Sequence, residues 1–531
     1  MKKISMIMLA VVALFATSCK DYLDVNVNQN KPTSVTADLI LPQALVATGL
    51  VLNQYNTYGA QVGGYMANAG GYGGFNEQTT YAFTPNNYAN LWAVSYDNLE
   101  DYQYMMDQTD GDPNFIFYNA VARIMKSYGF QLLVDAYNNV PYSQALLAAG
   151  NLTPEYDDAA TIYASLASEI DKAIADLNTG ISASVAPKAL GTNDVVFLGN
   201  TNLWIRFANS VKLRLLIRGQ GKVTFTNTSF DPAGFLNLDA LINPGFARDN
   251  NRQNPEWNQW TWTYAGTAQP KAWIPTTFIA AFYNNIKIND PGRGKKMYYQ
   301  WPTTGTNQLG FESTGIPKSP DGSFWYPGTE RGGTAAGNST GAIKGPDAGF
   351  VLMLRAESDF LLSEAFLSGI PTGASGDAQS WFTQGIKDAF YYTYSLPGGG
   401  LKKTTSTEDL KIVSGGDPTG DANAYITANA ANALVDWTAA ATNAQKLEAI
   451  ITQKYIAVNM VNSQEGYNEY RRTGYPTITG TDPTFASTVS ISSRQDRLPG
   501  RILYPTSEIQ YNPANVPPGI NTNNGVIFWA K

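Results

Sequence analysis

The sequence predicts a mainly α-helical protein in which long, irregular, aromatic-rich loops separate the helices. Apolar residues recur at spacings of three and four in several segments, which is the period of one helix face. The chain also holds 48 Gly and 28 Pro beside 31 Tyr and 11 Trp, so turn-forming and aromatic residues share the connecting segments. Because helix pairs that stack on one another form superhelices, we expect a tetratricopeptide-like helical superhelix, although the full repeat signature is absent.

The clearest helical periodicity lies in two neighbouring segments. Their apolar residues are Ile116, Ala120, Ile124, Tyr128 and Leu132 in the first, and Ile162, Leu166, Ile170, Ile174 and Leu177 in the second. Asp157 and Asp158 are candidate N-caps of the second helix, and Asn178 with Gly180 follow it. We expect the two segments to form an antiparallel helix pair.

Later segments repeat this spacing and are separated by long loops. The periodic residues are Trp204, Ala208, Val211 and Leu215, then Val351, Leu354, Leu361 and Ala365, then Leu447, Ile451, Tyr455 and Val458. The loops are Gly59–Gln78, Asn250–Trp273 and Pro291–Gly349. Loops of this size are usually functional or disordered, and their aromatic content favours function.

The composition excludes several kinds of chemistry. The 531 residues include no histidine and a single cysteine, Cys19. Histidine-dependent catalysis, an internal disulfide and a thiolate metal cluster are therefore excluded. The net charge is −7, or −9 without residues 1–18, which hold two lysines and no acid. This charge disfavours a nucleic-acid partner.

The N-terminus has the features of an export signal. Lys2 and Lys3 precede an apolar stretch, and small residues stand directly before Cys19 in a pattern that resembles a bacterial lipobox. The apolar stretch is shorter than the roughly 20 residues of a membrane-spanning helix. We expect residues 1–18 to be a lipoprotein signal peptide and residues 19–34 a flexible tether lipidated at Cys19. Residues 35–531 would then form the body, with loop insertions at about 59–90 and 220–349.

One match to a catalytic pattern is interpreted as chance. Gly337–Gly341 fits the G-x-S-x-G pattern of a nucleophile elbow, which needs a strand-to-helix turn and a histidine to deprotonate the serine. The chain has no histidine, and no apolar strand precedes the motif. Ser339 is therefore interpreted as a loop serine.

No cofactor is expected from the sequence. Oxygen ligands for calcium could come from Asp107, Asp110 and Asp112, or from Asp417 and Asp421. Neither set matches an EF-hand loop, and solvated loop acids are the simpler interpretation. The ligand chemistry would allow calcium, but the pattern gives it no support.

A Trp-rich stretch offers candidate ligand-binding residues. It contains Trp257, Trp260, Trp262 and Tyr264, and alternation puts the last three on one side of an extended segment. Flat aromatic rings stack on the C–H faces of sugars, and amides such as Asn258 bond to sugar hydroxyls. A peptide would suit such a surface too. The other interpretation is that the tryptophans fill the core beneath a loop.

Two further loops raise the same choice between ligand contact and core. The candidates are Tyr65, Tyr72, Phe75 and Asn76 in the Gly59–Gln78 loop, and Trp325 in the Pro291–Gly349 loop. Glycines beside the first group permit unusual turns and a close approach of ligand.

Several short segments, taken together with Cys19, resemble the SusD/RagB family of surface nutrient-binding lipoproteins. In chain order they are Asp21–Asn26, Gly199–Trp204, Asn209–Arg214, Ser363–Ala365, Gln453–Ala457, Glu469–Pro476 and Arg501–Glu508. Several matches in the right order are more specific than one, and the resemblance covers the whole chain. Lys20 followed by acid also looks like a surface-export signal.

The resemblance implies a fold with four tetratricopeptide-like units and a non-enzymatic role. Family members are lipid-anchored at the cell surface in the outer membrane, as lids over a SusC-like TonB-dependent transporter that imports oligosaccharides or, in some members, peptides. Their ligands meet aromatic and amide side chains in two regions, which correspond here to Gly59–Gln78 and Trp257–Tyr326. The family segment with Glu469, Arg471 and Arg472 is expected to be scaffold, held as a partly buried ion network.

Two alternatives to oligosaccharide capture stay open. The chain could be a peptide-binding member of the same family. It could also be a glycoside hydrolase, because that chemistry can run on two carboxylates alone and the chain holds 43 acidic residues. The sequence gives no way to choose such a pair.

Overall fold

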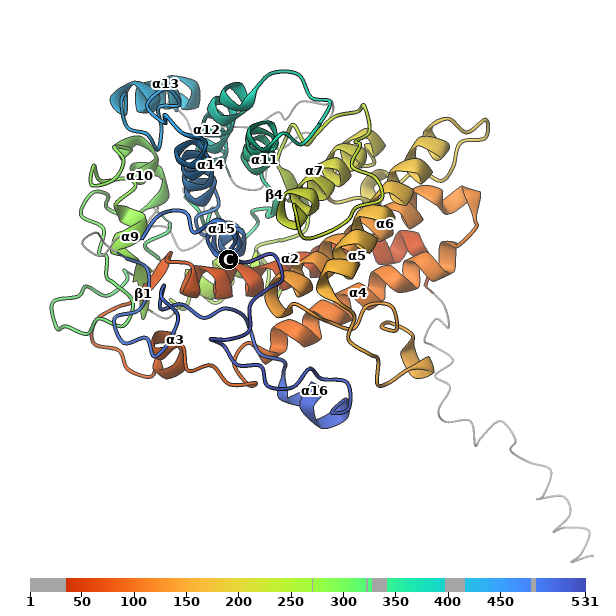
Figure 1. The fold of residues 1–531 in the computed structure, drawn as a ribbon, viewed down its shortest axis with the longest axis horizontal. Coiled ribbons are helices and arrows are strands. Elements are labelled where there is room, and N and C mark those ends of the chain that lie inside the picture. Colours follow the sequence, from red (N-terminus) through yellow and green to blue (C-terminus); the bar gives the residue numbers. More distant parts are fainter. Residues whose placement is uncertain (1–34, 270, 321–322, 327–340, 397–415, 479–483) are drawn as a thin grey trace, which may run out of the picture. The chain divides into compact units, whose positions relative to one another are not determined.

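Helices are the main regular structure of the fold, as the sequence predicts (Figure 1). The computed structural model describes residues 35–269, 271–320, 323–326, 341–396, 416–478 and 484–531. The chain divides into two units at Thr36, and the second unit, residues 37–531, is described here. Cys19, the predicted leader and tether in residues 1–34, and Ser339 lie outside the described residues.

Long helices are joined by short helices and four short strands. The helices of ten or more residues are α2 (Ala37–Val62), α4 (Ala89–Thr109), α5 (Ile116–Tyr137), α6 (Ala159–Ile181), α7 (Thr201–Gly219), α11 (Arg355–Ser368), α12 (Ala378–Tyr394), α13 (Pro418–Ala428), α14 (Asn443–Ala457) and α15 (Ser463–Thr473). The shorter α-helices are α3 (Asn76–Thr80), α8 (Pro255–Trp260), α9 (Thr277–Ala280), α10 (Pro291–Met297) and α16 (Thr506–Tyr511). Strands β1 (Met66–Asn68) and β3 (Trp273–Pro275) form one antiparallel sheet, and β2 (Ala240–Ile242) and β4 (Phe350–Met353) form another.

The predicted helix pair is confirmed as α5 and α6, which pack on each other. Asp158 is the N-cap of α6 and accepts a hydrogen bond from the Thr161 amide at 2.9 Å. Asp157 instead accepts from the Tyr142 backbone amide. Gly180 lies within α6. A Cβ there would come within 2.4 Å of the Phe117 ring on α5, which explains why the residue is glycine. This glycine therefore serves helix packing and does not end the helix.

One predicted helix begins later than its periodicity suggests. Val351 belongs to β4, which pairs with β2, and α11 begins only at Arg355. The Asp239 side chain accepts a hydrogen bond from the Arg355 amide at 2.8 Å and so satisfies one of the free N–H groups at the helix start. The other two periodic segments are confirmed as α7 and α14.

Neighbouring long helices pack on one another through most of the chain, which gives the tetratricopeptide-like arrangement. The packed pairs are α4 with α5, α5 with α6, α6 with α7, α7 with α11, and α11 with α12 and α14, while α15 packs on α2. Gly59 lies inside α2 and not in a loop. A Cβ there would lie 2.2 Å from the Gln464 backbone nitrogen of α15, so glycine is needed for the close packing of α2 on α15.

A buried ion network joins five of these helices. Its members are Asp135 of α5, Arg214 and Arg218 of α7, Glu357 and Glu364 of α11, Lys454 of α14, and Glu465, Glu469 and Arg472 of α15. Glu469 pairs with Arg472, as predicted, whereas Arg471 donates to the backbone oxygens of Asp135 and Gly500. The expected scaffold role of this family segment is confirmed.

None of the described helices combines the length and the apolar character that a membrane crossing needs.

Candidate ligand-binding site

The pairing of β1 with β3 joins the two regions in which ligand contacts are expected. Met66 lies opposite Pro275 and Asn68 lies opposite Trp273, so the segment after β1 and the segment around β3 share one edge. The Ala69 amide extends this contact by donating to the Ala272 carbonyl at 2.7 Å. Segments about 200 positions apart in the sequence are therefore fixed side by side (Figure 1).

Asn68 holds a third segment against the same edge. Its buried side chain donates to Glu312 Oε1 at 2.7 Å and to the Phe311 carbonyl at 3.2 Å, and it accepts from the Gly310 amide at 2.8 Å. Asn307 donates to the Asn68 carbonyl at 2.8 Å. Because an unpaired buried amide is costly, these bonds fix the position of residues 307–312.

Gly70 allows the chain after β1 to approach this segment closely. A Cβ at Gly70 would lie 2.6 Å from the Ile316 carbonyl oxygen and 2.7 Å from that of Ser313. Only glycine fits such an approach without moving the backbone. We name residues 70–76 together with residues 311–318 the β1–β3 rim.

The rim presents aromatic, amide and charged side chains to solvent. Tyr72 is half-buried, and Asn76 and Lys318 are exposed. The Lys318 ammonium lies 5.2 Å from the centroid of the Tyr72 ring, a cation–π contact. Phe311 is 49% exposed and lies next to the exposed Glu312. An aromatic surface bordered by hydrogen-bonding groups suits a polyhydroxylated ligand.

Two predicted residues form the packed base of the rim or the core behind it. Phe75 is buried and meets Trp273 edge to face, with ring centroids 5.2 Å apart. Tyr65 is fully buried, stacks on Tyr455 at 4.3 Å and donates its hydroxyl to the Tyr455 carbonyl. These rings position the rim but leave little or no surface for a ligand.

Trp257, Trp260, Trp262 and Trp325 are buried as well. The first and third contact each other and Tyr326, with centroids 5.0 to 5.9 Å apart, and Trp260 contacts Trp325 at 6.3 Å. In this arrangement the four rings fill the core beneath the loop and do not face solvent. Their indole Nε1 atoms have no hydrogen-bond partner in the part of the chain that the structure describes.

The Trp-rich stretch is also not extended throughout. Asn254 accepts hydrogen bonds from the Glu256 and Trp257 amides and starts helix α8, with Pro255 at its first position. The expected alternation therefore fails at Trp260, which ends that helix. Tyr264 follows in a narrow turn, where the Thr263 amide donates to the Thr267 carbonyl, and its side chain is 57% exposed.

Sequence reasoning found the rim regions but missed Phe311, Glu312 and Lys318. No periodicity or motif marks these residues, which reach the rim only through the contacts of Asn68 and Gly70 with their loop. Among the described residues, no group of three or more acidic side chains could hold a metal ion. Asp417, considered for calcium, is the N-cap of α13 and accepts from the Gly420 amide.

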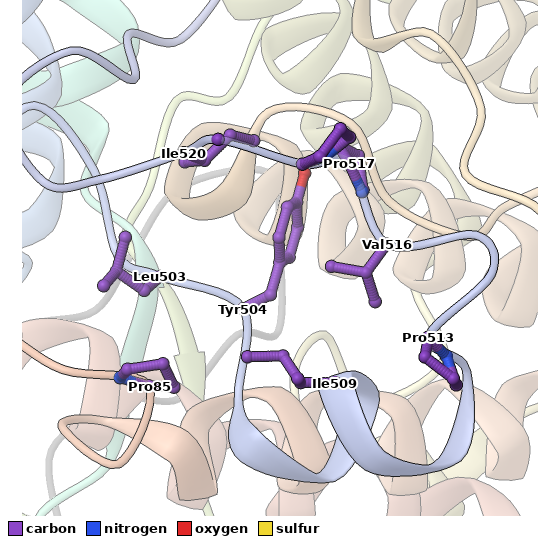
Figure 2. A pocket seen from close by; sticks show the side chains of 10 residues that line it. Pro85, Leu503, Tyr504, Ile509, Pro513, Val516, Pro517 and Ile520 are labelled. Carbon is purple, nitrogen blue, oxygen red and sulfur yellow. The ribbon is translucent and has the colours of Figure 1, made fainter.

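Pockets elsewhere on the described structure differ from the rim in chemistry. An apolar pocket of about 280 Å³ is lined by Tyr504, Ile509 and a proline-rich segment, with Pro85 from a distant part of the chain (Figure 2). The Tyr504 hydroxyl donates a hydrogen bond to the Asn139 carbonyl at 2.7 Å. A polar hollow of about 940 Å³ includes Gln308 and Arg494. The first suits an apolar side chain better than a sugar.

The fold is that of a stacked, tetratricopeptide-like helical protein. A model of the SusD-like family, described as starch-binding and associating with the outer membrane, matches residues 29–505. The chain belongs to this family of outer-membrane-associated binding proteins. A comparison with curated proteins gave no match.

Solved structures of family members have the same fold. A SusD homolog from Bacteroides fragilis is 20% identical, with 94% of this chain and 100% of that chain covered and a TM-score of 0.62. A SusD/RagB family protein from Bacteroides thetaiotaomicron is 19% identical, with 93% and 99% covered and a TM-score of 0.65. A chitin-binding SusD homolog from Flavobacterium johnsoniae is 21% identical, with 92% and 97% covered and a TM-score of 0.61.

Proposed function

We propose that this protein is a cell-surface lipoprotein that binds oligosaccharide at the β1–β3 rim and delivers it to a SusC-like TonB-dependent transporter. The observation that carries the proposal is the joining of distant segments by β1 and β3, with Tyr72 and Asn76 on solvent-accessible backbone. The glycines between them support this role, since a Cβ at Gly73 or Gly74 would meet nothing within 4 Å. Ligand can therefore approach the backbone there.

Sugar recognition follows from the chemistry of the rim. The ring of Tyr72 stacks against a pyranose face, while Asn76, Glu312 and Lys318 exchange hydrogen bonds with its hydroxyls. The family description and the chitin-binding relative agree with a glycan ligand. Tyr264 is exposed and adds a further aromatic contact if a long chain extends beyond the rim.

Anchoring and delivery complete the proposal. Cys19 carries the lipid after removal of residues 1–18, and two or three acyl chains hold the protein durably at the outer membrane. The transporter then receives the ligand from the rim. Co-purification of the wild-type chain with a transporter, and its loss in a Cys19→Ala variant that is still exported, would test the anchoring step.

A calorimetric titration of the full-length chain with polysaccharides, oligosaccharides and peptides tests the ligand class. We expect saturable binding to at least one glycan, with the glycan recovered intact. Binding to peptides alone would replace oligosaccharide by peptide as the ligand. Cleavage products would indicate a hydrolase, although the buried Asp359 and Asp388 hydrogen-bond each other, closer than the roughly 5 to 9.5 Å between paired glycosidase carboxylates.

A further inference from the structure

A pocket with both polar and apolar side chains in its lining lies between α7, α11, α12 and residues 232–237. Its volume is about 550 Å³, within the range of small-molecule sites. The side chains that matter here are Arg206, Asp359, Trp381 and Gln384. None of these elements contributes to the β1–β3 rim, and Figure 1 shows α11 and α12 well apart from β1 and α3.

Arg206 supplies an uncommitted positive charge to this pocket. It lies on α7 and is half-buried. Within the described residues it makes neither a hydrogen bond nor an ion pair. The other arginine of the pocket, Arg355, is paired with Asp388 at 2.7 Å. A guanidinium without a carboxylate partner is a ready site for a planar anion, which it can bind through two parallel N–H donors.

Asp359 supplies an unsatisfied hydrogen-bond acceptor. Its side chain is 2% exposed and hydrogen-bonds Asp388, yet its Oδ2 atom has no partner in the described structure. Burial, with the neighbouring Asp388 carboxylate, raises the pKa of Asp359 well above its ordinary value. A hydrogen bond between two carboxyl groups needs a proton, so Asp359 and Asp388 hold it between them. A buried acceptor left unpaired is costly, and a ligand hydroxyl would satisfy it.

Trp381 supplies a fixed aromatic wall. Its indole Nε1 donates to the Ser375 carbonyl at 2.9 Å, and the ring packs against the apolar cluster that includes Phe235 and Leu362. The side chain remains half-buried and lines the pocket. Beside it, a Cβ on Gly373 would meet nothing within 4 Å. The indole is thus held in place next to open space.

We propose that this pocket binds a carboxylate-bearing sugar of the hexuronic acid class. The sugar carboxylate pairs with Arg206, the pyranose ring lies against Trp381, and a ring hydroxyl donates to Asp359 Oδ2. Arg206 favours an acidic ligand, because Arg355 is already paired with Asp388 and Arg206 has no such pair within the described residues. The pocket is a second ligand site that goes beyond capture at the rim.

Calorimetric titration of the full-length chain with D-galacturonic acid and D-glucuronic acid tests this site, with D-galactose and D-glucose as neutral counterparts. We expect saturable binding of at least one uronic acid, with affinity at least about tenfold above that of its neutral counterpart. Arg206→Gln should lower this affinity at least about tenfold, since a charge-assisted pair is lost. Arg252→Gln, at a 70% exposed arginine outside the pocket, should leave it unchanged.

Three results would overturn the proposal. They are the absence of uronic acid binding, equal affinity for acidic and neutral sugars, and unchanged affinity in Arg206→Gln. Tyr72→Ala at the rim separates the two sites, because it should leave uronic acid affinity at the wild-type value. Loss of uronic acid binding in Tyr72→Ala but not in Arg206→Gln would assign that ligand to the rim and refute the second site alone.

Discussion

Arg218→Gln should strongly destabilise the fold, because Arg218 lies at the centre of the buried ion network. Its guanidinium pairs with Asp135 at 2.5 Å and with Glu465, and lies 3.4 Å from Glu469. All four side chains are at most 1% exposed. Removing one partner of a buried pair costs about 3–5 kcal/mol. Since this change leaves three carboxylates short of a partner, we expect a loss of about 5 kcal/mol.

Urea unfolding followed by tryptophan fluorescence measures this loss as the change in apparent free energy of unfolding. Arg252→Gln is the matched control, because the Arg252–Asp249 pair is 3.6 Å long and both side chains are at least 70% exposed. The control should change stability by no more than about 0.5 kcal/mol. A loss below about 1 kcal/mol in Arg218→Gln would show that the network does not hold the helices together.

Three further predictions concern acid, the tryptophan core and the rim backbone. Burial alone would raise the pKa of Glu465, but nearby cations lower it to about 2 from an ordinary 4.5. The contribution of Glu465 to folding stability is therefore present above pH 4.5 and lost as pH falls through 2. Thermal unfolding midpoints that stay constant to pH 2 would contradict this. Trp262→Ala should cost about 3–5 kcal/mol in urea unfolding, as expected for a buried ring, and a loss under 1 kcal/mol would place the ring outside the core. Gly70→Ala, whose Cβ would lie 2.6 Å from a carbonyl oxygen of residues 313–316, should weaken glycan binding in calorimetry while Gly73→Ala does not; equal affinities would refute the role of this close approach.

The helical part of the fold could be predicted from the sequence because each buried face repeats at the helical period. The segment from Ile116 to Leu132 falls inside α5 for this reason. Helix ends were less predictable where glycine serves packing between helices. Gly59 and Gly180 look like breaks in the sequence, yet both lie inside helices whose close neighbours exclude a Cβ. The contacts that explain them come from segments distant in the chain.

The sequence predicts two candidate regions, and the structure places them side by side, but the exposed residues within them could not be predicted. The residues around Tyr72 and the Trp-rich stretch have the same local composition, with aromatic and amide side chains close together. Burial decides their roles, and it depends on the pairing of β1 with β3 and on the helix begun by Asn254. Trp257 therefore lies in the core while Tyr72 reaches the surface. The residues next to Trp257 and Tyr72 in the sequence do not predict which of the two is buried.

The affinity of Tyr72→Ala for a glycan that the wild-type chain binds tests the central claim most directly. Tyr511→Ala is the matched control, because Tyr511 is 76% exposed on α16, away from the rim. We predict that calorimetry gives at least about a tenfold loss of affinity for Tyr72→Ala, or about 1.4 kcal/mol, and no change for Tyr511→Ala. Equal affinities in the wild-type chain and Tyr72→Ala, with both folded, would contradict glycan capture at the β1–β3 rim.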